Sequence, residues 1–259
     1  MSSRFTHSAY RLAVSAAVVG GLAAGWMVPN HAQAQAQAQS QGQPRAQATA
    51  AGQTASKPAT APADFWIDIA NDRAANVKKF LAKGVSPNAV NGNSNSPLLE
   101  AIKVEAWDTY AVLMADKRID LNQRNLLGES PLMYLAIKND LARTKAMIDR
   151  GAEVNQPGWT ALHYAATAGA DDIVRLLIEK YAYIDAESPD KSTALMMAVR
   201  YGHESTVKLL LDESADGYAR NEAGKNAVDI GNETGNQRIA QYVVERLNEE
   251  KRRKAASGR

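Results

Sequence analysis

A seven-residue pattern recurs along the chain and constrains its fold more than any other feature. Each copy begins with Ser, Thr or Asn and continues with small and aliphatic residues: SPLLEAI at Ser96, SPLMYLA at Ser130, TALHYAA at Thr160, TALMMAV at Thr193 and NAVDIGN at Asn226. The copies begin at nearly equal intervals, and the shortest step is the one from Ser130 to Thr160. A period of about 33 residues predicts stacked helical units, each covering the apolar side of its neighbour.

Within one period, residues 158–180 (GWTALHYAATAGADDIVRLLIEK) hold two short helical patterns separated by Gly169. An isolated helix of under about 12 residues is only marginally stable in water, so these helices need tertiary support. The Ser or Thr that begins the first four heptapeptides is suited to cap the first helix, and Gly169 to end it in the left-handed conformation. The second helix carries a dense aliphatic stripe that includes Leu177. The equivalent residue one period later is Leu210, and both are expected in the core between units.

The repeated pattern resembles the ankyrin repeat. That family's sequence T-P-L-H-x-A-A, then Gly-His, an aliphatic helix and G-A-D-V-N, is nearly complete in the unit that begins at Thr160. The resemblance covers residues 64–248 and implies an all-α solenoid of about six helix-turn-helix units, caps included, joined by turns or β-hairpins. Two departures stand out. The junction VNQPGWT lacks about three residues of the period, and Tyr181 and Ser214 occupy positions where the family prefers glycine.

The chain before the repeats has the features of an export signal followed by a linker. Residues 1–34 combine a basic start, the apolar run 12–28 and a small-residue cleavage pattern at Ala32 and Ala34. Residues 35–63 are rich in Ala, Gln and Pro and are expected to be a disordered linker, as is the basic tail 249–259. We therefore expect a bacterial periplasmic protein; the alternatives are retention of residues 12–28 as an inner-membrane anchor, or secretion.

Composition argues against several functional classes. With 30 basic and 28 acidic residues, two of the basic ones in the expected signal, the charge of the mature chain is balanced. Neither nucleic-acid binding nor binding to an anionic membrane surface is therefore expected. After cleavage of the signal, no stable membrane insertion is expected either. No familiar catalytic motif occurs, cysteine is absent, and His163 and His203 lie where ankyrin repeats commonly place histidine. We expect no enzymatic activity, cofactor or metal, and interpret both histidines as hydrogen-bonding links between repeats.

Function is therefore expected to reside in protein recognition. In ankyrin stacks, the turn tips and the exposed side of each first helix form an extended concave surface, which implies a protein partner for a monomeric chain. The residues predicted to contact it are Lys103, Leu126, Leu127, Lys138, Trp159, Arg200 and Tyr201. Trp, Tyr and Arg dominate binding hot spots, although Trp159 could instead pack over the shortened junction. The alternative functions are a membrane-tethered spacer, a secreted effector that binds a host protein, or an enzyme with an atypical site.

Overall fold

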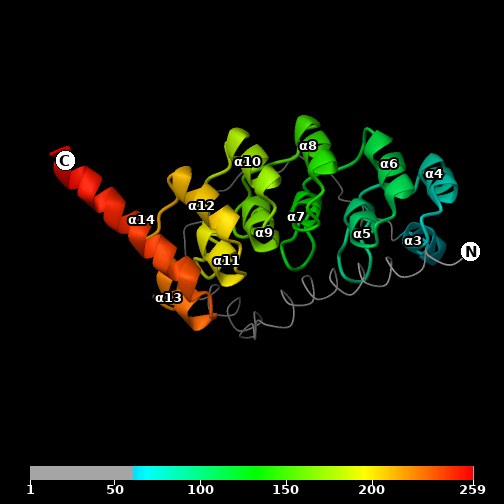
Figure 1. Ribbon diagram of the computed structural model, residues 1–259. Coiled ribbons are helices and arrows are strands. Elements are labelled where there is room, and N and C mark those ends of the chain that lie inside the picture. The colour runs from blue at the N-terminus through cyan, green and yellow to red at the C-terminus, as the bar shows by residue number, and fades with distance from the viewer. Residues whose placement is uncertain (1–60, 259) are drawn as a thin grey trace, which may run out of the picture. The chain divides into compact units, whose positions relative to one another are not determined.

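The structure is a computed structural model that describes residues 61–258, and this part of the chain consists of twelve α-helices without a strand (Figure 1). The predicted export signal and nearly all of the predicted linker lie outside the described residues. The all-α fold predicted from the repeats is confirmed. The helices are α3 (Ala63–Ala70), α4 (Ala74–Ala82), α5 (Pro97–Lys103), α6 (Trp107–Ala115), α7 (Pro131–Ile137), α8 (Leu141–Asp149), α9 (Ala161–Ala168), α10 (Asp171–Glu179), α11 (Ala194–Arg200), α12 (Glu204–Asp212), α13 (Ala227–Glu233) and α14 (Gln237–Ala256).

The helices form six consecutive pairs, and neighbouring pairs pack against each other. The first helices make one row, in which α3 contacts α5, α5 contacts α7, α7 contacts α9, α9 contacts α11 and α11 contacts α13. The second helices make another row, seen as the line of α4, α6, α8 and α10 in Figure 1. Each pair thus buries its apolar side against the next, which is how helices of seven to nine residues become stable.

Local sequence signals set where the first helices begin. The side chain of Ser96 accepts a hydrogen bond from the backbone N–H of Leu99 at 3.2 Å, and that of Asn226 accepts one from Asp229 at 3.0 Å. The predicted capping role is therefore confirmed at Ser96. These bonds satisfy donors that the first turn of any helix leaves without a partner inside the helix.

The core between units contains the aliphatic residues expected from the repeat. Leu177 of α10 and Leu210 of α12 are completely buried, and the leucines of the first helices are at most 2% exposed: Leu98, Leu132, Leu162 and Leu195. The turn between the two helices of a unit always contains a left-handed residue, and in three of the six units it is not glycine: Asp72, Glu105 and Asn139. Packing between units therefore tolerates local strain that glycine would remove.

The connections between units show both departures noted in the sequence. The connection from α8 to α9 runs from Arg150 to Thr160, whereas that from α10 to α11 runs from Lys180 to Thr193 and is three residues longer. Tyr181 and Ser214 adopt φ values of +64° and +70°, so a side chain is held in the left-handed region at both positions. Each such residue costs about 1–2 kcal/mol relative to glycine.

A ladder of amide side chains ties each connection to the next. The side chain of Asn155 accepts a hydrogen bond from the backbone N–H of Tyr183 at 2.8 Å and donates one to the carbonyl of Tyr181 at 2.7 Å. Asn88 makes the same two contacts two connections earlier, to Asp120 and Arg118. At the next step the residue is Asp185, which accepts a hydrogen bond from the N–H of Asp216 at 2.8 Å. A carboxylate lacks the N–H that asparagine would offer to the second carbonyl.

Replacing Asp185 with asparagine is expected to stabilise the fold by about 0.5–1 kcal/mol, the usual net value of one added hydrogen bond. Burial raises the pKa of Asp185 above its ordinary value of 3.8. The hydrogen bond from the Asp216 N–H lowers this pKa, and the negative charge of Asp216 raises it. Because the folded-state pKa is raised, the wild-type chain loses stability as pH rises from about 3.8 through that pKa. Urea unfolding at pH 4 and pH 7 should show a larger gain for D185N at pH 7. A gain that is absent at both values would contradict the ladder.

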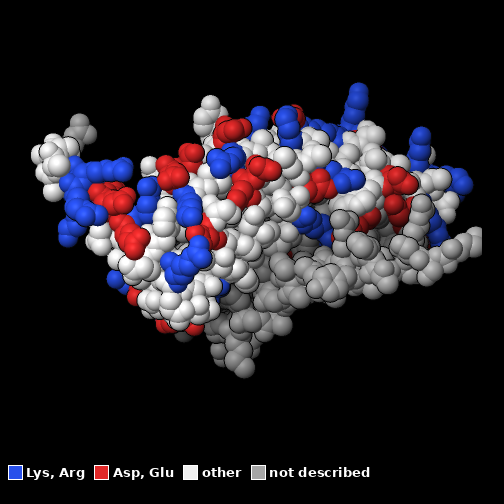
Figure 2. All heavy atoms as spheres, in the orientation of Figure 1, with Lys and Arg blue, Asp and Glu red and all other residues white. Residues whose placement is uncertain are grey.

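The C-terminal helix is longer than the sequence suggested. We expected residues 249–259 to form a disordered tail, whereas α14 continues to Ala256. Lys254 pairs with Glu250 one helical turn earlier, and basic residues in the last turn complement the negative end of the helix dipole. Figure 2 shows the basic side chains gathered at this end of α14.

Among residues 61–258, no helix combines the length and the apolar character needed to cross a membrane.

Candidate protein-interaction face

The exposed side of the first helices, together with the tips of the connections that precede them, forms the candidate site. We call this surface the first-helix face; it is formed by α5, α7, α9, α11 and α13 and by the tips of the connections before them, up to the residue before each N-cap. Glu129, Trp159 and Lys225 are such residues, one from each of three connections. Since the first helices contact one another in sequence, side chains from successive units lie side by side on this face.

A hydrogen-bond network crosses the centre of the first-helix face. The carboxylate of Glu129 accepts hydrogen bonds from the side-chain amide of Asn125 at 2.7 Å, from the hydroxyl of Tyr134 at 3.0 Å and from the hydroxyl of Tyr164 at 3.1 Å. Asn125 also donates to the side chain of Asn95 in the preceding connection at 3.1 Å. The network therefore joins three consecutive units and fixes the spacing between them.

The two tyrosines of this network are held in their neutral form. Burial raises the pKa of Tyr134 well above its ordinary value, and the charge of Glu129 raises it further. The same two causes, in the same order, raise the pKa of Tyr164. Both hydroxyls therefore remain donors at any physiological pH, and their role here is to position Glu129.

Two of the predicted contact residues lie at opposite ends of this network. The ammonium nitrogen of Lys103, at the end of α5, lies 5.3 Å from the centre of the Tyr134 ring. The ring of Trp159 meets those of His163 and Tyr164 edge-on, with centroids 5.3 Å and 6.5 Å apart. Trp159 is partly exposed, so one part of the indole packs on its own unit and another part is available to a partner.

The other predicted contact residues spread over the rest of the face. Arg200 is the last residue of α11, and Tyr201 directly after it is 37% exposed. Lys138 at the end of α7 forms an ion pair with Glu105 at 2.9 Å, and its side chain is only 10% exposed. The structure therefore gives Lys138 a partner inside the stack.

Leu126 and Leu127 project from the tip of the connection before α7. They are 79% and 71% exposed, more than any other large aliphatic side chain of the described residues. The N–H of Leu127 donates to the side chain of Asn125 at 2.9 Å, which holds the tip in place. Two adjacent leucines fixed in this way form an apolar contact point beside the network.

Both described histidines link neighbouring units, as predicted. The Nε2 atom of His163 lies 2.9 Å from the carbonyl of Ser192 in the next connection, and its Nδ1 accepts from the N–H of Thr160 at 3.2 Å. The Nε2 atom of His203 lies 2.9 Å from the carbonyl of Thr167 in the preceding unit. Burial lowers the pKa of His163, which favours the neutral ring that these contacts require.

Sequence reasoning missed the tyrosines at the centre of the face. Tyr134 and Tyr164 occupy the same position of the heptapeptide, four residues after the cap, where the earlier unit has Glu100. That shared register was the available signal. Glu100 has a role like that of Glu129, because it accepts from the amides of Asn91 and Asn95 at 3.1 Å and 2.8 Å. Within residues 61–258, no group of three or more His, Asp or Glu side chains is arranged to hold a metal ion.

Comparison with known proteins is consistent with this architecture. The pattern described as ankyrin repeats (3 copies) matches residues 108–190 and 182–255. An ankyrin repeat protein of Rickettsia bellii (strain RML369-C) is 31% identical over 165 residues, which cover 59% of this chain and 90% of the relative.

Other relatives are much longer proteins. The transient receptor potential cation channel subfamily A member 1 homolog of Caenorhabditis elegans is 32% identical over 142 residues, covering 54% of this chain and 11% of the channel. Palmitoyltransferase Hip14 of Drosophila melanogaster is 36% identical over 94 residues, covering 35% of this chain and 15% of the relative. This chain therefore spans only a small part of these two proteins.

The matched repeats extend over more than half of the chain, and the R. bellii relative is covered almost completely. Together with six stacked helix pairs whose histidines and asparagines link successive units, they show that the chain belongs to the ankyrin repeat family.

Proposed function

We propose that this chain is a non-catalytic protein-binding scaffold of the bacterial periplasm, and that it recognises a protein partner through the first-helix face. Ankyrin stacks are typical protein-interaction scaffolds, because their repeats present an extended surface of independently variable side chains. The observation that carries the proposal is the network of Glu129, Tyr134 and Tyr164. It holds a row of side chains rigid across three units and places Trp159 at its edge.

A rigid surface of this kind favours binding, because little conformational entropy is lost when the partner docks. Trp159, Arg200 and Tyr201 belong to the residue types that supply most of the binding energy at interfaces. The exposed leucines Leu126 and Leu127 would add an apolar anchor at the tip of one connection. The tyrosine hydroxyls and Glu129 are engaged with one another, which supports a structural role for them in preference to proton transfer.

The test is capture of a partner from periplasmic extract, followed by binding measurements with the purified partner. Replacing Trp159 and Arg200 by alanine is expected to weaken binding about 30-fold or more, because loss of a hot spot costs about 2 kcal/mol or more. Tyr181→Ala is the matched control, since Tyr181 is an aromatic residue, 85% exposed, that lies after a second helix. Circular dichroism must show unchanged helicity for each variant. Equal binding by the double variant and the wild-type chain would exclude this surface.

The periplasmic location rests on the composition of residues 1–34 and has a separate test. The mass of the chain recovered from a periplasmic fraction should correspond to a start near Gln35. Recovery of residues 12–28 in a membrane fraction would instead support the tethered spacer, and recovery from the culture medium would support the secreted effector. Neither result would change the expectation for Trp159 and Arg200.

A further inference from the structure

The two ends of the repeat stack differ in how polar their outer sides are. Terminal repeats need polar outer faces to remain soluble. At the C-terminal end, none of the exposed large hydrophobic side chains of the described residues belongs to α13 or α14. At the other end, Ile67 of α3 is 50% exposed and lines the same hollow as the partly exposed Phe80 of α4. The outer side of the first unit therefore has an apolar centre without a covering repeat.

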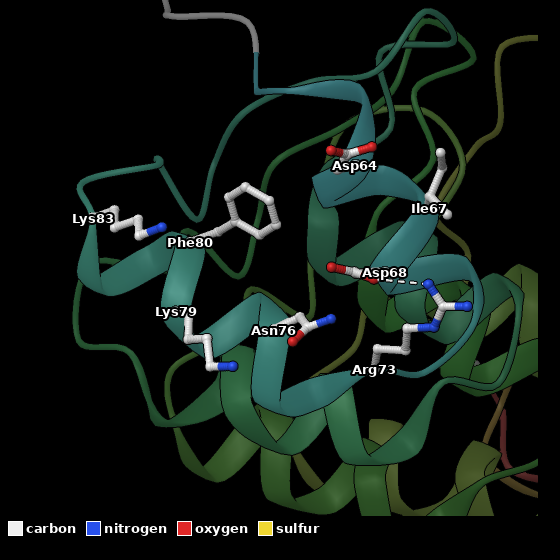
Figure 3. Close-up of a pocket in the computed structure, with 8 residues that line it drawn as sticks. All are labelled: Asp64, Ile67, Asp68, Arg73, Asn76, Lys79, Phe80 and Lys83. Carbon is white, nitrogen blue, oxygen red and sulfur yellow. Dashed lines mark hydrogen bonds and ion pairs between the residues drawn. The ribbon is translucent and has the colours of Figure 1, made fainter.

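This apolar centre lies in a hollow of about 370 Å³ between α3 and α4 (Figure 3). Charged side chains surround it with opposite signs on its two sides. Asp64 and Asp68 come from α3, whereas Lys79 and Lys83 come from α4 and the residue after it. Asp68 pairs with Arg73 at 3.3 Å. Asp64, Lys79 and Lys83 make no ion pair within the described part of the chain, so three charges around the hollow remain available.

The preceding segment of the same chain is a poor candidate to cover the hollow. Residues 35–60 contain no Leu, Ile, Val, Met, Phe, Tyr or Trp, so they have no large apolar side chain to pack on Ile67 and Phe80. The apolar run 12–28 belongs to the segment that we expect to be removed on export. A covering surface must therefore come from another molecule that has an apolar centre and charges of both signs.

We propose that a second copy of this chain covers the hollow, forming a dimer through the outer sides of the two first units. The helices α3 and α4 run in opposite directions, so Asp64 at the start of α3 and Lys83 after the end of α4 lie at the same end of the pair. A two-fold axis parallel to both helices and midway between them places α3 of one copy over α4 of the other. Each Asp64 then faces Lys83 of the second copy, and the two Phe80 rings, which point from α4 toward α3, approach the axis (Figure 3).

This interface is self-complementary, as a two-fold contact must be. The acidic side of one copy meets the basic side of the other, and the two apolar centres meet each other. The contact is small, because each copy contributes only two helices of eight and nine residues. Interfaces below about 1,200 Å² of total buried area are typical of weak complexes. The dimer thus forms only at high concentration, and the monomer expected from the sequence is the dilute form.

Sedimentation velocity of the purified chain over a concentration series tests the dimer. The average mass is expected to rise toward that of two chains as concentration increases. The proposed dimer contains two pairs in which Asp64 of one copy faces Lys83 of the other. Lys83→Glu places two negative charges opposite each other in both pairs, and Asp64→Lys places two positive charges opposite each other. Each single variant is expected to weaken the dimer at least tenfold, whereas the double variant D64K/K83E restores opposite charges and should return the dissociation constant to near the wild-type value.

Lys78→Glu is the matched control, because Lys78 is an exposed residue of the same helix that does not line the hollow. It should leave the dissociation constant unchanged, and circular dichroism should show the same helicity for all four variants. A mass that stays at one chain up to the highest concentration would overturn the proposal. So would equal weakening by K78E and K83E, or a double variant as weak as either single one. Because restoration requires a folded chain, it also excludes misfolding as the cause of weakening.

Discussion

Replacing Leu177 with alanine is expected to lower the free energy of unfolding by about 2–5 kcal/mol. Leu177 is completely buried in α10, which packs against α9 of its own unit and against α8 and α12 of the two neighbouring units. The substitution removes apolar contact area and leaves a cavity among helices that are too short to be stable alone. Because stability in a repeat stack depends on the interfaces between units, the loss affects two interfaces at once.

Urea unfolding followed by circular dichroism measures this effect. Arg175→Ala is the matched control, because Arg175 lies in the same helix with its side chain exposed. The control should change the free energy of unfolding by less than about 0.5 kcal/mol. A midpoint for L177A equal to that of the wild-type chain would show that α10 does not present this residue to the core.

Replacing Gly169 with alanine is expected to lower the free energy of unfolding by about 2–4 kcal/mol, for two separate reasons. Gly169 has a φ of +66°, in the left-handed region that disfavours a side chain. A methyl group there would also lie 2.5 Å from Nδ1 of His203. The imidazole ring is rigid and its Nε2 lies 2.9 Å from the carbonyl of Thr167, so moving the ring would disturb a link between units.

Gly235 separates these two causes. It occupies the equivalent turn of the last unit with a φ of +81°, and a methyl group there would meet no atom within 4 Å. G235A should therefore show the backbone cost alone, about 1–2 kcal/mol. The difference between the two variants, measured by urea unfolding, isolates the contact with His203. Equal losses would show that the ring moves aside at little cost.

Much of the fold could be predicted because its determinants are local and periodic. Ser96 begins a helix through a bond to a residue three positions later, and Leu177 and Leu210 share one register of the repeat. The same register showed that Tyr181 and Ser214 occupy positions where the family prefers glycine. The extent of α14 was not, because a run of charged residues suggested solvated disorder, whereas pairs such as Glu250 with Lys254 suit a helix.

The candidate site was only partly predictable. Trp159, Arg200 and Tyr201 could be placed on the first-helix face from register alone. The ion pair of Lys138 with Glu105 and the bond of Tyr164 to Glu129 join residues 33 and 35 positions apart, which meet between units. No periodic pattern encodes these contacts, since each arises where one particular unit meets its neighbour.

The sequence by itself determined that this chain is a stack of helix pairs, which side of each helix is buried and which residues begin or end the helices. Those features recur from unit to unit and depend on contacts within a few positions. The tertiary structure decided which side chains of different units bind one another and that Glu129 organises the first-helix face. It also decided that Ile67 and Phe80 line an uncovered hollow at one end of the stack. These depend on the interfaces between units, where residues distant in the chain are brought within hydrogen-bond and van der Waals distance.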